Sequence, residues 1–261
     1  MKLRTVQATR YVTPLKEGGS LPAIVEADDA GMYVVKFRGA GQGPKALIAE
    51  LLGGELARAA GLRVPEIVFI EIDADLARTE PDPEIQHLIR GSAGLNIALD
   101  YLPGAVTFDP VVEQPPPDVA ASIVWFDALV TNVDRTPRNT NLLMWHGQLH
   151  LIDHGAALYF HHAWNDDFLE RSCDPFALVR DHVLLQFCNA AALREADRVL
   201  PGRITPELIA ELAEMIPQSW LSPHPGKVAD YRHGYREYLQ RRLVAPRHFA
   251  EETVRARSLL V

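Results

Sequence analysis

Three polar residues near the middle of the chain have the types and the spacing that phosphoryl transfer requires. Asp134 and Asn139 lie five residues apart in a polar loop that contains Pro137. Asp153 follows at the end of a short apolar run, shortly before Gly155. Transfer from a metal nucleotide needs one carboxylate to orient the acceptor hydroxyl, and an amide and a second carboxylate to hold magnesium. The stretch therefore predicts a kinase-type active site.

The roles of these three residues depend on what lies between them. An Asp and an Asn at this spacing also occur in ordinary capped turns, so the pair alone is weak evidence. Short apolar runs at 141–145 and 148–152 predict a hairpin that returns the chain to the loop. We therefore predict that Asp134 is the catalytic base or orients the acceptor hydroxyl, and that Asn139 and Asp153 share one metal ion.

A lysine in the first third of the chain is a second candidate. Lys36 lies within an apolar, β-branched run, where an ammonium is costly unless it meets a counter-charge or a phosphate. The alternative is a solvent-facing lysine on an alternating strand. Helical spacing over 44–60 follows, and Glu50 on that helix could pair with Lys36 and hold it toward a nucleotide. Glu55 is the rival partner, although it lies on a different face of the helix.

Small and basic residues could supply further phosphate contacts. Gly18, Gly19 and Ser20 form a turn in which backbone N–H groups could approach phosphates. Arg135 and Arg138 place two positive charges beside the predicted site, where they would steady a phosphate or the loop itself. The alternative for both arginines is a solvated loop charge.

The elements that must position these residues change in type along the chain. Strands are predicted at 3–12, 23–38 (broken near 28–31) and 64–72, and an apolar run at 95–102 ends at Pro103-Gly104. Helices are predicted at 44–60, 118–131, 175–198, 205–215 and 226–257, and 76–92 is predicted to be irregular. The pattern favours an α+β fold with two lobes, 1–103 rich in strands and 104–261 mostly helical, joined at Pro103-Gly104.

Composition narrows the classes of function. The chain of 261 residues has 26 basic and 34 acidic side chains, a net charge of −8 that makes general nucleic-acid binding unlikely. It contains no apolar run near the roughly 20 residues that span a bilayer, and no apolar N-terminal signal. Its two cysteines, Cys173 and Cys188, have no metal spacing. We therefore expect a cytoplasmic protein without a membrane span.

Taken together, these segments resemble the HipA-like kinases and, more distantly, the phosphatidylinositol 3/4-kinases. The resemblance extends from about residue 5 to 250 and is strongest over 130–156. The segments that carry it, in chain order, are Glu17-Gly-Gly-Ser-Leu-Pro22, Tyr33-Val-Val-Lys-Phe37, Glu50, Asp134-x4-Asn139 and Ile152-Asp-His-Gly155.

The resemblance implies a role for each candidate residue in a reaction that uses ATP and Mg²⁺. Lys36 would contact the nucleotide phosphates, and Glu50 would position Lys36. Asp134 would be the catalytic aspartate, while Asn139 and Asp153 would bind magnesium. The turn of Gly18, Gly19 and Ser20 would cover the phosphates, with Ser20 a site of autophosphorylation. The acceptor would be a protein Ser/Thr hydroxyl.

Several alternatives stay open at this point. Thr136 departs from the pattern of the lipid kinases, which have a histidine at that position. Asn132-Val133 stands where aminoglycoside- and choline-type kinases usually have His-Gly, and this difference favours the HipA-like interpretation. A small-molecule or lipid acceptor, transfer of AMP in place of phosphate, and a pseudokinase that binds nucleotide without turnover are each compatible with the same fold.

Overall fold

Five strands of the N-terminal region close into a small barrel in the order β1-β2-β3-β5-β4. The computed structural model describes residues 2–15, 21–41, 43–164, 166–221 and 228–260. All neighbouring strands of the barrel run antiparallel except β1 and β4, which are parallel. The strands are β1 (Thr5–Pro14), β2 (Ala23–Ala27), β3 (Met32–Lys36), β4 (Ile67–Ile72) and β5 (Gly94–Asp100).

The sequence of β3 shows why the barrel closes around an apolar interior. Tyr33 and Val35 are buried on one face of the strand, whereas Met32 on the opposite face is exposed. This alternation follows from the two-residue period of a strand. The strand ends at Lys36, so the lysine lies at the barrel rim and not in the middle of an apolar strand.

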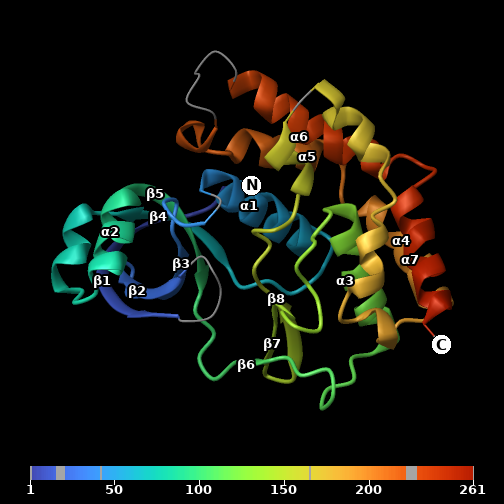
Figure 1. Cartoon of the computed structure of the whole chain (residues 1–261), viewed down its shortest axis with the longest axis horizontal. Helices are drawn as coiled ribbons and strands as arrows, with labels where there is room; N and C mark the ends of the chain where they lie inside the picture. The colour runs from blue at the N-terminus through green and yellow to red at the C-terminus, as the bar shows by residue number, and fades with distance from the viewer. Residues whose placement is uncertain (1, 16–20, 42, 165, 222–227, 261) are drawn as a thin grey trace.

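Two helices belong to the same part of the chain. The first, α1 (Pro44–Ala59), begins with Pro44 at its first turn and ends just before Gly61, whose φ is 87°. The second, α2 (Pro83–Gly91), is capped by Asp82, whose side chain accepts a hydrogen bond from the Glu84 N–H. Figure 1 shows α2 against the barrel at one end of the molecule and α1 near the centre.

The remaining chain is mostly helical and includes one small sheet. Strands β6 (Val106–Thr107), β7 (Leu142–Trp145) and β8 (Gln148–Leu151) form that sheet. The helices are α3 (Pro117–Leu129), α4 (Ala190–Val199), α5 (Pro206–Met215), α6 (Val228–Leu243) and α7 (His248–Leu259). Helix α3 is apolar on nearly all sides, so it lies in the interior, where α4 and α7 pack against it (Figure 1).

Buried apolar side chains form two clusters. One fills the barrel and the space under α2, with Val35, Ile70 and Ile89 among its members. The other joins α1 to α3 and the C-terminal helices, with Leu51 and Trp125 among its members. Helix α1 therefore connects the strand-rich region to the helical region through its packing.

Three secondary-structure predictions were wrong. Residues 76–92 contain a 3-10 turn (Ala74–Thr79) and α2, not an irregular segment. The predicted helix 175–198 is helical only from Ala190, because short 3-10 turns precede it and Asn189 caps its start. The predicted helix 226–257 is divided into α6 and α7 by the segment that contains Pro246.

The mixed α+β class, with strands first and helices later, is confirmed. Within the part of the chain that the structure describes, every helix is too short or too polar to cross a lipid bilayer.

Candidate active site

Three residues far apart in the chain meet beside the barrel rim. Lys36 at the end of β3 places its Nζ 2.6 Å from Oε2 of Glu50 on α1. The same Nζ lies 2.5 Å from Oδ1 of Asp153, which follows β8. The side chain of Lys36 is 11% exposed and that of Glu50 is fully buried, whereas that of Asp153 is 40% exposed. The ammonium is thus held between one internal and one accessible carboxylate.

The charges of this triad stabilise one another. Burial alone would lower the pKa of Lys36, but the carboxylates of Asp153 and Glu50 outweigh burial and raise it to about 12. Burial alone would raise the pKa of Glu50, but Lys36 and His154 together lower it to about 2. At neutral pH the lysine and the glutamate are therefore an ion pair.

Glu55, the rival partner of Lys36, does not contact the lysine. The Glu55 carboxylate is also fully buried, but its ionic contact is to Arg58 Nε on the same helix, at 3.7 Å. Burial raises the pKa of Glu55. The structure therefore pairs Lys36 with Glu50 and not with Glu55, in agreement with the prediction from their different helix faces. The alternative of a solvent-facing Lys36 was wrong.

The double glycine of α1 allows two close approaches. A Cβ at Gly53 would lie 2.8 Å from Cβ of His154, and a Cβ at Gly54 would lie 2.3 Å from Cδ1 of Ile67 on β4. His154 is fully buried, with its Nδ1 3.5 Å from Oε1 of Glu50. Helix α1 therefore fits tightly against both the barrel and the residue that follows Asp153.

The loop before β7 presents Asp134 between two amides. The Nδ2 of Asn139 lies 2.7 Å from Oδ2 of Asp134, and the Nδ2 of Asn141 lies 3.3 Å from the same oxygen. The turn between them is closed by Thr136, whose N–H donates to the Asn139 carbonyl and whose carbonyl accepts from the Asn139 N–H. Asn141 was not among the residues singled out from the sequence.

The pKa of the Asp134 carboxyl is raised, first by partial burial and also by the nearby charge of Asp153. The amide N–H groups of Asn141 and Asn139 act in the opposite direction. A carboxyl whose pKa is raised by burial and by a second carboxylate is a typical setting for a cation or for proton transfer.

The oxygen donors of these residues would supply only part of the coordination shell of a hard cation such as magnesium. Asp153 supplies an accessible carboxylate, and Asn139 uses its Nδ2 toward Asp134, which leaves its amide oxygen as a donor. Among the described residues, no three His, Cys, Asp or Glu side chains are grouped closely enough to hold a metal. Magnesium usually binds through one or two carboxylates plus substrate phosphates, so this sparse set is compatible with it.

Backbone strain gathers around these residues. Thr131, Asn141, Asp153 and Leu158 have φ values of 52°, 48°, 54° and 56°, in the left-handed region that L-residues rarely adopt. Each such conformation persists only where the surroundings impose it.

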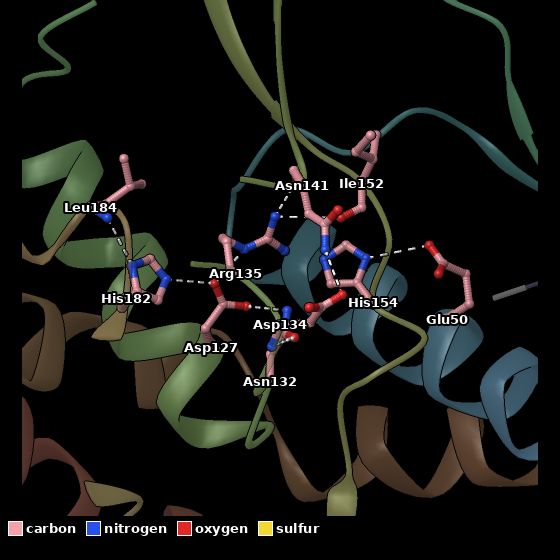
Figure 2. Close-up of polar contacts among 10 residues, drawn as sticks. All are labelled: Glu50, Asp127, Asn132, Asp134, Arg135, Asn141, Ile152, His154, His182 and Leu184. Carbon is pink, nitrogen blue, oxygen red and sulfur yellow. Dashed lines mark hydrogen bonds and ion pairs between the residues drawn. The ribbon is translucent and has the colours of Figure 1, made fainter. Parts of the chain in front are cut away.

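Arg135 is not a solvated loop charge, so that alternative was wrong. Its side chain is fully buried and its Nε lies 2.5 Å from Oδ2 of Asp127 on α3. Figure 2 shows Arg135 between Asp127 and Asn141, with His182 on the far side of Asp127. Arg138 is exposed, as a loop charge would be. The turn of Gly18, Gly19 and Ser20 lies outside the described residues.

Comparison with known proteins gives the class and the family. A family model described as HipA-like kinase matches residues 9–242. Because that match covers most of the chain, the chain belongs to the HipA-like kinase family, whose members are kinase-type phosphotransferases. No curated protein sequence shows significant similarity to it.

Two similar solved structures carry the same fold. The Helicobacter pylori proinflammatory kinase CtkA has a TM-score of 0.59 and 13% identity, with 100% of this chain and 99% of that chain covered. The Golgi casein kinase, in a crystal structure with Mn/ADP bound, has a TM-score of 0.51 and 13% identity, with coverage of 95% and 74%. At such identities the likeness concerns the fold.

Proposed function

We propose that the protein is an ATP- and Mg²⁺-dependent kinase that phosphorylates a protein Ser/Thr hydroxyl. The observation that carries the proposal is the convergence of Lys36, Glu50 and Asp153, together with Asp134 held by the amides of Asn139 and Asn141. The site would lie between two lobes, 1–103 and 104–261. The cytoplasmic location expected from the sequence stays a prediction.

Each residue has a separate task in this proposal. Asp134 accepts the proton of the acceptor hydroxyl as its oxygen attacks the γ-phosphorus, and the bond to the β–γ bridging oxygen breaks to release ADP. Lys36, steadied by Glu50, binds the phosphates. Asn139 and Asp153 would hold Mg²⁺, which neutralises charge on the β- and γ-phosphates when bound.

The turn of Gly18, Gly19 and Ser20 would cover the phosphates. Phosphorylation of Ser20 would then oppose ATP binding through like charge. Mass-spectrometric mapping after incubation with ATP tests this part, and an unmodified Ser20 in an active preparation would refute it.

Two parallel incubations with labelled ATP test the reaction. The protein is given Mg²⁺ and either γ-labelled or α-labelled ATP, first alone and then with casein or with phosphoinositide vesicles. The proposal is supported if protein becomes labelled by γ-labelled ATP and not by α-labelled ATP. Label on the vesicles alone would indicate a lipid kinase, and label from the α position would indicate AMP transfer.

Binding without transfer is a separate outcome. If MgATP binds, as measured by calorimetry, but neither label is transferred to any acceptor, the pseudokinase alternative holds. The variant Asp134→Asn serves as the control for contaminating kinases, because it should remove all label that this active site transfers.

A further inference from the structure

A fully buried ion pair lies directly behind the candidate catalytic loop. Oδ2 of Asp127 accepts from Nε of Arg135 at 2.5 Å and from Nε2 of His182 at 2.9 Å. Oδ1 of Asp127 accepts from Nδ2 of Asn132 at 3.1 Å, and Oδ1 of Asn132 accepts from the Asp134 N–H at 3.2 Å. The carboxylate on α3 is therefore connected to both neighbours of Val133-Asp134 (Figure 2).

The guanidinium of Arg135 extends this network to two further segments. Its Nη1 donates to the carbonyl oxygens of Asn141 and Ile152, the second at 3.4 Å. Asn141 lies two residues after Asn139, and Ile152 immediately precedes Asp153. Since Arg135 itself follows Asp134, this one residue connects the segments that carry Asp134, Asn139 and Asp153.

His182 closes the network as a neutral group. Its Nδ1 accepts from the Leu184 N–H at 3.0 Å, so that nitrogen carries no proton. Its Nε2 must then donate to Asp127, and burial, which lowers the pKa of His182, favours the same neutral form. The next residue, Val183, donates its N–H to the Arg135 carbonyl at 3.1 Å. The net charge of Asp127, Arg135 and His182 is therefore zero.

We propose that Asp127, Arg135 and His182 form a positioning clamp that fixes Asp134, Asn139 and Asp153 relative to one another, without contacting substrate. This inference rests on the proposed kinase function. A displacement of about 1 Å can reduce a rate about a hundredfold, so loss of the clamp lowers turnover more than nucleotide affinity.

The main test is the neutral double variant Asp127→Asn/Arg135→Met. It leaves no unpaired buried charge, and the new amide can still accept from His182, so the variant should fold. We expect kcat to fall about a hundredfold while KM for ATP changes less than about threefold. A kcat within about twofold of wild type, or a loss confined to KM, would overturn the clamp.

A second Asp–Arg ion pair, away from the loop, separates positioning from stability. Arg247 before α7 binds Asp197 of α4, with 2.7 Å between Nε and Oδ1. The variant Asp197→Asn/Arg247→Met should also lower the thermal midpoint but leave kcat within about twofold. If both double variants lost kcat equally, the effect would be one of stability.

A conservative single variant covers the case in which the double variant does not fold. Arg135→Lys keeps the positive charge beside Asp127, but a single ammonium cannot reproduce the fork that spans three oxygens. It should fold and still show reduced kcat. Full activity of Arg135→Lys would show that only the charge matters and would overturn the clamp.

Hydrogen exchange tests the clamp without catalysis. The N–H groups of Asp134, Ile152 and Val183 are each hydrogen-bonded within the network. Their exchange should accelerate about tenfold or more in Asp127→Asn/Arg135→Met and stay unchanged in the control pair. Unchanged protection would overturn the clamp, whereas a wild-type protein that transfers no phosphate would refute only the kinase proposal.

Discussion

The ammonium of Lys36 lies 2.5 Å from a carboxylate oxygen of Asp153, although 117 residues separate the two along the chain. Asp153 is the carboxylate to which we assign a metal ion. In this arrangement the lysine and a cation would compete for it, and a phosphate that draws the lysine away would relieve the competition. Metal and nucleotide are therefore expected to bind cooperatively.

The variant Lys36→Met tests this competition. Removing the ammonium should raise the affinity for free Mn²⁺ about threefold to tenfold, because a like charge is removed from the site. It should lower the affinity for Mn·ATP about tenfold, because a phosphate contact is lost. Calorimetric titrations with Mn²⁺ alone and with Mn·ATP measure both changes.

A neighbouring lysine provides the control. Lys45 in the first turn of α1 donates from Nζ to the His161 carbonyl at 2.6 Å and has no role in the proposed cation site. Lys45→Met should leave the Mn²⁺ affinity unchanged. A parallel rise in both variants, or a loss of free Mn²⁺ binding in Lys36→Met, would contradict the competition.

The assignment of Asp134 as the base predicts a clean separation of binding from chemistry. Asp134→Asn should lower phosphate transfer about a thousandfold or more while leaving the Kd for MgATP within about threefold. The exposed Asp181, whose ionic contact is to Arg180, provides Asp181→Asn as a control that keeps full activity. Wild-type transfer by Asp134→Asn would show that the base is another group.

Acid should weaken the fold through Glu50. Its pKa is lowered from 4.5 to about 2 in the folded state, so its contribution to stability is complete above pH 4.5 and declines as the pH falls toward 2. Urea unfolding between pH 2 and 6 should therefore show a smaller decline for Glu50→Gln than for the wild type. Glu84→Gln, at an exposed position of α2, should keep the wild-type decline.

Gly53 of α1 and Gly91 of α2 should differ in how replacement by alanine changes the stability of the protein. At Gly53 a Cβ would meet His154 at 2.8 Å, so Gly53→Ala should destabilise the protein by about 1–3 kcal/mol. At Gly91, the last residue of α2, a Cβ would meet nothing within 4 Å. Gly91→Ala should therefore be neutral or stabilise by up to about 1 kcal/mol. Thermal unfolding of both variants checks the pair, and equal effects would refute the packing argument.

Local signals were sufficient for the elements that carry the candidate site. The apolar, β-branched run around Lys36 predicted β3, although not that the strand ends there. Helical spacing predicted α1 with Glu50 on the correct face, and the apolar runs at 141–145 and 148–152 predicted the β7–β8 hairpin. Each of these depends on periodicity or turn chemistry within about ten residues, which a sequence displays directly.

The missed elements had weaker or opposing local signals. Helix α2 buries chiefly Ile85 and Ile89 in an otherwise polar segment, so its apolar face is narrow. Its start was nonetheless marked by Asp82 followed by Pro83, a cap and a first-turn proline. Pro246 similarly marks the break between α6 and α7.

The network behind the loop could not be predicted from the sequence. Arg135 follows a candidate catalytic residue in a polar loop, which is typical of a solvated charge. Its partners Asp127 and His182 come from a buried helix and from a segment 47 residues later. Asp127, Arg135 and His182 come together only through tertiary contacts, which cannot be predicted from the local spacing of residues.

The left-handed backbone at Thr131, Asn141 and Asp153 has a consequence for protein engineering. This conformation costs most L-residues about 1–2 kcal/mol relative to glycine, and Asn or Asp less, so glycine replacements there should be favoured by a screen for thermal tolerance. At Asn141 the replacement would remove an amide that contacts Asp134, and at Asp153 it would remove a carboxylate that we assign to the metal ion. Selection for heat resistance and selection for turnover should therefore move this protein in opposite directions at Asn141 and Asp153.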